Sequence, residues 1–234
     1  MGLVASEVQR LVALGAPVLC ADTCSILDIM RDPTREEARS HNFQAALDLV
    51  AKMASHGKLV SLLAPQVQRE LNANTAEVED VTKSKISKFK QQADRVFAIA
   101  RIFGVTGTVE LSDLPRFAVG ARSAFDRWIA ASTPTVQSAG VADRAIARMD
   151  IGRTPGKPGG GLVKDCIVIE TYLEAVTELR DAGLKSKIVF LSSNTRDYAG
   201  RDDSGLNHDL KAEFDPLEIV YASNASHAKV LLGV

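Results

Sequence analysis

The sequence predicts an α/β fold in which helices flank a mainly parallel central sheet of about four to five strands. Short runs without polar residues, such as Val18–Ala21 and Ile188–Leu191, carry this prediction, because an uninterrupted apolar run suits a strand buried on both faces. Stretches with helical spacing separate these runs, and a helix between two strands implies a right-handed parallel crossover. The chain has 234 residues, so we expect a single domain over residues 1–234 with a helical insertion at about 75–150.

The first part of the chain is expected to form a helix and then a buried strand. Residues 3–14 have amphipathic spacing, residues 6–9 match a helix capping box, and Gly15 ends the helix. The apolar run Val18–Ala21 follows and stops abruptly at Asp22. This order places a carboxylate at the carboxyl end of the first strand.

A second helix and strand lead to another acidic residue. A capping box at residues 34–37 predicts a helix that continues to about Ser55, and residues 59–63 form the next apolar strand. Pro65 suits the first turn of the helix after that strand. The same helix holds Glu70, which therefore lies just beyond the second strand.

Residues 75–150 are predicted to be helical and to pack beside the sheet without forming a domain of their own. A long, highly charged helix over residues 75–103 has few apolar positions, as is typical of a projecting or partly packed helix. Two further helices are expected over residues 116–131 and 135–149, before the glycine- and proline-rich segment 152–161 breaks the periodicity.

The last third of the chain returns to alternating helix and strand. A helix over residues 165–182 leads to the strand Ile188–Leu191, and residues 217–221 are the final strand candidate. Asp165 begins this helix, and polar residues follow the strand: Ser192, Ser193, Asn194 and Asp197. Because ligand sites in open α/β sheets form at the carboxyl ends of the strands, we expect these groups to meet the two earlier carboxylates on one rim.

The composition argues against several classes of protein. A net charge of −1 disfavours a protein that coats nucleic acid, and an aromatic content of 5% disfavours base recognition dominated by stacking. The 3 cysteines lack CxxC spacing and the 4 histidines lack ligand-pair spacing, so we expect neither a zinc site nor a disulfide framework. No apolar run approaches the ~18 residues of a membrane span, and no signal peptide opens the chain. We therefore expect a cytoplasmic protein with reduced thiols and no membrane partner.

An acidic cluster at one rim of the sheet needs compensating charge. Two carboxylates about 4 Å apart repel each other by roughly 4 kcal/mol at an effective dielectric constant of about 20. Proton uptake or a bound cation relieves this repulsion, and oxygen ligands of this kind suit Mg²⁺ or Mn²⁺. A metal ion held by carboxylates lowers the pKa of bound water and clamps phosphoryl oxygens, which is the chemistry of phosphodiester hydrolysis.

The acidic segments resemble, in order, the motifs of PIN-domain nucleases. Residues 19–28 are similar to the opening motif, an apolar strand followed by an aspartate and a small hydroxyl residue. Residues 67–71 and 163–170 resemble the second and third acidic positions. Residues 189–198 resemble the fourth motif of a subgroup of larger PIN-like domains, Asn-Thr-(Lys/Arg)-Asp-aromatic. The resemblance is weakest over the helices at about 75–150.

This resemblance implies a metal-dependent endoribonuclease that hydrolyses RNA phosphodiester bonds. The residues implied to be catalytic are Asp22, Glu70, Asp165 and Asp197. The ligands implied for Mg²⁺ or Mn²⁺ are Asp22, Asp165, Asp197 and Asn194. The residues implied to support these ligands by hydrogen bonds are Thr23 and Ser192. Glu170 lies five residues after Asp165 on the same helix, so we expect it to support the ligands without binding the metal, and a solvated helix glutamate is the alternative interpretation. Many family members have an aspartate where this chain has Asn194, and an amide recruits Mg²⁺ less strongly than a carboxylate does.

Basic residues indicate where a substrate would bind. Arg153, Lys157 and Lys164 lie in or beside the glycine-rich segment that precedes the third acidic position, and this combination suits a phosphate group. Lys85 and Lys88 belong to the basic middle of the long helix and would follow a phosphate backbone. A surface linker and a solvated helix face are the alternative interpretations of these two segments.

Other functions stay open at this point. A PIN-like scaffold with a degraded metal site would bind RNA or a protein partner without cleaving it, and a nuclease of this type would also be suited to DNA. The sequence leaves open a protein inhibitor and a homo-oligomer as further partners. A haloacid-dehalogenase-like phosphatase is disfavoured, because the second aspartate that it needs would fall at Cys24.

Overall fold

The centre of the molecule is a parallel sheet. The computed structural model describes residues 1–55, 57–156, 163–200 and 205–234. Its sheet has five strands in the order β3-β2-β1-β4-β5, and each strand is parallel to its neighbours. The strands are β1 (Val18–Ala21), β2 (Val60–Leu63), β3 (Thr133–Pro134), β4 (Ile188–Leu191) and β5 (Ile219–Ala222). The predicted α/β class and its parallel sheet are confirmed.

The three inner strands are apolar because both of their faces are covered. Every residue of β1, β2 and β4 is buried. β1 lies between the other two, with Val18 in register with Val60 on one side and with Ile188 on the other. The chain winds from β1 to β2 and β3 in one direction, whereas β4 and β5 lie in the other, so the winding reverses between β1 and β4. Such a switch point is where open α/β sheets form their ligand sites.

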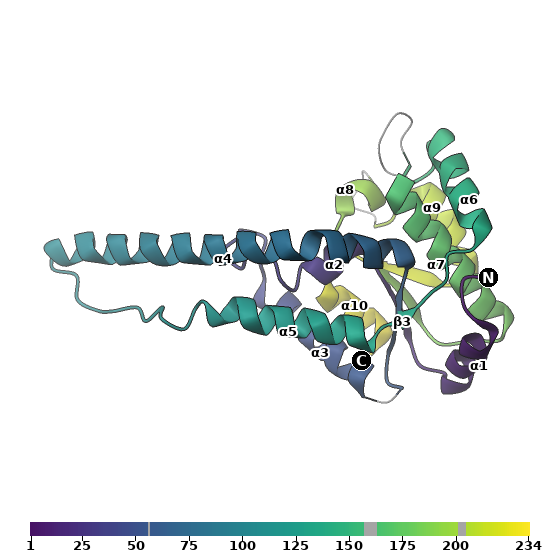
Figure 1. Cartoon of the computed structure of the whole chain (residues 1–234), viewed down its shortest axis with the longest axis horizontal. Helices are drawn as coiled ribbons and strands as arrows, with labels where there is room; N and C mark the ends of the chain where they lie inside the picture. The colour runs from purple at the N-terminus through teal and green to yellow at the C-terminus, as the bar shows by residue number, and fades with distance from the viewer. Residues whose placement is uncertain (56, 157–162, 201–204) are drawn as a thin grey trace.

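Helices cover both faces of the sheet (Figure 1). The first group consists of α1 (Ala5–Leu14), α6 (Ala139–Asp150) and α7 (Val163–Asp181), and α7 contacts both of the others. The second group consists of α3 (Ser40–Ala54), α5 (Arg116–Ala131) and α10 (Ala225–Leu232), and α3 contacts both of the others. The short elements are α2 (Thr23–Leu27) after β1, α8 (Thr195–Tyr198) after β4, and α9 (His208–Phe214) with the 3₁₀ turn Asp215–Leu217 before β5.

The longest helix, α4 (Pro65–Ile102), has 38 residues and projects well beyond the sheet (Figure 1). Pro65 occupies its first turn, as expected, because an N–H at that position would have no partner within the helix. The near half of α4 is anchored: Ile86 is buried, and the Thr82 hydroxyl donates to the Met30 carbonyl at 2.8 Å. The far half exposes several apolar side chains: Phe89, Val96 and Ile99. The sparse apolar positions of this segment therefore correspond to a projection, as predicted.

Both predicted capping boxes are wrong, because neither Ser6 nor Thr34 is the residue at which a helix begins. α1 begins after Val4, so Ser6 and Gln9 of the first box already lie inside the helix. α3 begins at Ser40, well after the predicted start at Thr34. The backbone N–H and the hydroxyl of Thr34 both donate to a carboxylate oxygen of Asp32, at 2.8 and 2.7 Å. This turn holds the chain away from helical geometry for the residues before α3.

Three further boundaries differ from the expectation. The helix with Glu70 and the charged helix are one continuous element, in which the hydroxyl of Thr75 bonds back to the Leu71 carbonyl without interrupting the helix. β3 was not predicted, since it has only 2 residues and one of them is Pro134, which suits an edge strand. The last strand begins at Ile219, because the residues before it form a 3₁₀ turn.

Two simpler expectations concerned the cysteines, expected as reduced thiols, and membrane-spanning segments, of which none was expected. Cys20, Cys24 and Cys166 are all free. In the part of the chain that the structure describes, no helix combines the length and the apolar composition needed to cross a bilayer.

Candidate active site

Asp22 is fixed at the switch point of the sheet. It is 4% exposed and directly follows β1, and its backbone N–H donates to the Leu191 carbonyl of β4 at 2.9 Å. Three groups donate to its carboxylate: the Thr23 N–H at 2.8 Å, the Ser192 hydroxyl at 2.8 Å and the Cys24 thiol at 3.2 Å. Burial raises the pKa of Asp22, and these hydrogen bonds oppose the rise. The carboxylate is thus held in one orientation without a cationic partner at ion-pair distance among the described residues.

Glu70 is tied to the same loop from the opposite side. It lies in the second turn of α4, where the Thr23 hydroxyl donates to one carboxylate oxygen at 2.6 Å and the Gln66 amide donates to the other at 2.7 Å. Thr23 therefore links the residue after β1 to the helix after β2. Thr23 and Ser192, predicted as supporting residues, each donate a hydrogen bond to one of the predicted acidic residues.

Asp165 lies in the first turn of α7, and Tyr172 holds that helix in place. The Tyr172 hydroxyl donates to the Ala21 carbonyl at 2.7 Å and accepts from the Ala64 N–H at 3.3 Å. These two residues sit at the carboxyl ends of β1 and β2. One buried phenol on α7 thus fixes the helix against the rim where Asp22 lies.

The charge of Asp165 is coupled to that of the other acidic residues. Burial raises the pKa of Asp165 to about 7, with further contributions from the negative charges of Asp22, Glu70 and Asp197. Within the described residues, no hydrogen bond reaches the Asp165 side chain. The negative charges of three acidic residues from three other segments of the sequence therefore act on Asp165.

The segment after β4 supplies the remaining polar groups. The Asn194 amide donates to a carboxylate oxygen of Asp197 at 2.8 Å, and the Asn194 N–H donates to the Ser192 hydroxyl oxygen at 3.2 Å. Asn194 lines the cleft described below. Asp197 is not among the residues that line it, and its influence on the site is through its charge and through Asn194.

An open cleft of about 350 Å³ collects five of the predicted residues, Asp22, Thr23, Glu70, Asp165 and Asn194. We call it the carboxylate cleft and define it by its acidic lining residues, Asp22, Glu70, Glu77 and Asp165. Glu77 was missed at the level of sequence, together with Arg31 and Asn74, which also line the cleft.

The spacing along α4 would have revealed two of these missed residues. Asn74 and Glu77 follow Glu70 by four and seven positions, so all three lie on one face of a continuous helix. The predicted break near Thr75 concealed this relationship. Arg31 follows the short helix α2 and had no motif to mark it.

The carboxylates share the cleft without forming a closed cage of ligands. Within the described residues, no group of three or more His, Cys, Asp or Glu side chains is arranged to hold a metal ion. The tight cluster expected from sequence is therefore not preformed. Two causes keep the carboxylates apart. Asp22 and Glu70 are each held by a hydrogen-bond donor of their own, Ser192 and Thr23, and the like charges repel one another.

Comparisons of the chain with protein-family models, with curated proteins and with solved structures found no match. The donors of the carboxylate cleft are carboxylate and amide oxygens with uncompensated negative charge, a set that fits a hard divalent cation.

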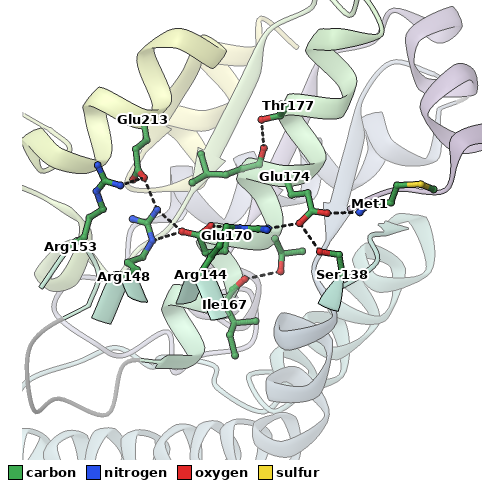
Figure 2. A network of polar contacts seen from close by, with 12 residues as sticks. Met1, Ser138, Arg144, Arg148, Arg153, Ile167, Glu170, Glu174, Thr177 and Glu213 are labelled. Atoms are coloured by element: carbon green, nitrogen blue, oxygen red, sulfur yellow. Dashed lines mark hydrogen bonds and ion pairs between the residues drawn. The ribbon is translucent and has the colours of Figure 1, made fainter. Parts of the chain in front are cut away.

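Glu170 belongs to a different network, which corrects its predicted role (Figure 2). Its carboxylate accepts from the Arg148 Nε at 2.8 Å and from the Arg144 Nε at 3.0 Å. Arg148 is 3% exposed and also pairs with Glu213 at 2.8 Å. In the described chain no hydrogen bond joins Glu170 to Asp22 or Asp165. Glu170 instead neutralises a buried guanidinium and holds α6 against α7.

The predicted substrate-binding residues are dispersed. Arg153 pairs with Glu213 at 3.0 Å, which ties it to the network of Glu170. Lys164 is exposed beside Asp165, whereas Lys157 lies outside the described residues. Lys85 and Lys88 are exposed on α4. Arg31, which was not predicted, lines the cleft itself.

Proposed function

We propose that this chain is a metal-dependent endoribonuclease that hydrolyses RNA phosphodiester bonds at the carboxylate cleft. The observation that carries the proposal is that Asp22, Glu70 and Asp165, from three separate segments of the sequence, line one cleft at the switch point of a parallel sheet. The order of these residues in the sequence resembles that of PIN-domain nucleases and supports the same function.

The residues present fit a divalent ion, Mg²⁺ or Mn²⁺. Asp22 and Asp165 would hold it, and the amide oxygen of Asn194, whose NH₂ group donates to Asp197, would complete the oxygen donors on the side of β4. A bound divalent ion would supply positive charge to activate water and to stabilise phosphoryl oxygens. That charge would also offset the repulsion that raises the pKa of Asp165.

Each side chain of the cleft has a role that follows from its contacts. Ser192 and Cys24 orient Asp22, and burial raises the pKa of Cys24 to about 12, so that it stays a neutral thiol donor. Thr23 orients Glu70. Asp165, with no hydrogen bond from the described residues, can take up or release a proton near neutral pH. Arg31 would attract the substrate phosphate to the rim.

The projecting helix α4 would guide the RNA backbone. Lys85 and Lys88 are exposed there, and charge reversal of both, Lys85→Glu with Lys88→Glu, should weaken RNA binding and reduce its salt dependence. The measurement is RNA affinity over a series of salt concentrations. An unchanged slope of affinity against salt would exclude this helix from the binding surface.

The decisive experiment is a cleavage panel with single-stranded RNA, structured RNA and DNA, each with and without Mn²⁺. The proposal predicts metal-dependent RNA cleavage that falls by about 100-fold or more in Asp22→Asn and in Asp165→Asn. The matched control is Asp94→Asn, the same chemical change at an exposed position on α4. Cleavage of DNA alone would change the substrate, and RNA binding without any cleavage would favour the inactive scaffold. Variants as active as the wild type would overturn the assignment.

A further inference from the structure

A second pocket, of about 330 Å³, adjoins the carboxylate cleft. Arg31 lines both of them. The same two loops also contribute to both: Cys24 and Asn194 face the cleft, whereas their neighbours Ser25 and Ser193 line the second pocket. The Ser193 N–H donates to the Ser25 hydroxyl oxygen at 2.8 Å, which joins the two loops on the pocket side.

The two hollows have opposite charge. The carboxylate cleft has four carboxylates against the single guanidinium of Arg31. The second pocket, which we call the arginine pocket, has three guanidinium groups, from Arg31, Arg35 and Arg39, against the carboxylates of Asp28 and Glu37. An anion would therefore be attracted to the arginine pocket in the absence of any metal.

The arginines keep hydrogen-bond donors for a ligand. Arg31 and Arg35 share the single carboxylate of Asp28, at 3.0 and 3.8 Å. Within the described residues Arg39 has no ion pair, and its guanidinium donates only to the backbone carbonyls of Glu36 and Ala38. Each guanidinium has five N–H groups, so most of these donors remain available for phosphate oxygens.

The pocket also contains an acceptor that needs a donor. The Oδ1 atom of Asn42 is buried and has no hydrogen-bond partner among the described residues, so a ligand reaches it only when the Asn42 side chain turns toward the pocket that it lines. A buried acceptor without a partner is unfavourable by about 1–3 kcal/mol, which a ligand N–H or O–H group would relieve. Ile29, Phe43 and Ala46 give the same pocket an apolar surface.

We propose that the arginine pocket binds the nucleotide adjacent to the scissile phosphate of the RNA substrate. This inference rests on the proposed function, because it places the scissile phosphate in the neighbouring carboxylate cleft. The phosphate of that nucleotide contacts Arg35 and Arg39, its sugar hydroxyl or base N–H donates to Asn42, and its ring lies on the apolar surface. Arg31, shared by both hollows, lies between the two phosphates.

The first test measures binding without cleavage. AMP and inorganic phosphate are titrated into the full chain, and binding is followed by nuclear magnetic resonance. EDTA in the buffer removes divalent ions, so the carboxylate cleft stays negative and repels the anion. Arg35→Ala and Arg39→Ala should each weaken AMP binding by about tenfold, whereas Asn42→Leu should weaken AMP binding and leave phosphate binding unchanged. Arg10→Ala, an exposed arginine on α1, is the matched control and should bind as the wild type does. Equal affinity of the wild type for AMP and phosphate, or unchanged AMP binding in Arg39→Ala, would overturn the proposal.

The second test uses cleavage and separates this inference from the proposed function. Adding one nucleotide to a short RNA substrate should raise kcat/KM for the wild type and raise it much less for Arg35→Ala with Arg39→Ala. The same gain in both proteins would exclude the pocket as a nucleotide site even though the chain is a nuclease. AMP binding that depends on Arg39, in a chain that cleaves no RNA, would refute the proposed function and leave the pocket a nucleotide-binding site.

Discussion

The hydroxyl of Ser192 donates a hydrogen bond to the carboxylate of Asp22 at 2.8 Å, although the two residues lie 170 positions apart in the sequence. Each residue directly follows a strand, and the last residues of these strands, Ala21 and Leu191, are in register. The parallel pairing of β1 with β4 is therefore what brings the first and fourth motifs together.

The first prediction concerns this contact. Ser192→Ala removes one of three donors to Asp22 and should weaken Mn²⁺ affinity by roughly 10–100-fold, because groups that orient a metal ligand contribute on that scale. Isothermal calorimetry with Mn²⁺ measures the change. Ser193→Ala is the matched control, since its hydroxyl makes no hydrogen bond to Asp22 in the described chain. Equal losses in the two variants would show that the contact has no orienting role.

The second prediction concerns the pH dependence of stability in the metal-free protein. The folded pKa of Asp165 is raised to about 7 from an ordinary value of 3.8, so the folded state binds this proton more tightly than the unfolded state does. The stabilising effect of the proton is complete below about pH 4 and is lost as the pH rises toward 7. Asp165→Asn cannot titrate, so its stability relative to the wild type should rise by about 2–3 kcal/mol between pH 5 and pH 8.

Urea unfolding in EDTA at these two pH values measures that difference. Asp94→Asn, at an exposed position, should show no such change. If the stability of Asp165→Asn relative to the wild type is the same at both pH values, Asp165 is not coupled to the other carboxylates as described.

The third prediction compares two fully buried tyrosines. Tyr172→Phe removes the hydroxyl that bonds to Ala21 and Ala64, and should lower the free energy of unfolding by about 1–3 kcal/mol and weaken Mn²⁺ binding. Tyr198→Phe is the control, because its hydroxyl is buried without a partner among the described residues and its loss should be neutral or stabilising. Urea unfolding separates the two. A greater loss in Tyr198→Phe would contradict the positioning role of Tyr172.

The fourth prediction concerns the network of Figure 2. Arg148→Ala would remove the buried guanidinium that Glu170 and Glu213 share and leave each carboxylate with one partly exposed arginine, which should lower the free energy of unfolding by about 3 kcal/mol. Arg144→Ala should cost less, because that side chain is 46% exposed and Glu170 keeps its contact with Arg148. Denaturant unfolding of both variants tests the difference, and equal losses would mean that burial of Arg148 is not what matters.

Much of this fold could be predicted because burial on two faces leaves a clear mark in a sequence. The strands Val18–Ala21 and Ile188–Leu191 and the helix Arg116–Ala131 have the bounds that apolar periodicity indicates. Capping signals were less informative, because Thr34 has the right residue type but bonds to Asp32. Local propensity does not reveal whether a hydroxyl will accept from the N–H groups of a helix start or donate to a neighbouring carboxylate.

The site was predictable where residues follow strands and not where they depend on tertiary packing. Asp22 and Ser192 could be placed by the rule that sites form at strand ends. Glu77 could not be found once α4 was divided near Thr75. Glu170 has the spacing of a site residue, yet its partner Arg148 comes from another helix, and no sequence pattern links the two.

The central claim is that the carboxylate cleft binds a divalent cation, and calorimetric titration of Mn²⁺ into the metal-free chain near pH 7 tests it most directly. We predict that the wild type and Asp94→Asn bind the ion alike, and that Asp22→Asn and Asp165→Asn each bind it at least about tenfold more weakly. Absence of binding to the wild type, or equal affinity in Asp165→Asn, would contradict the account.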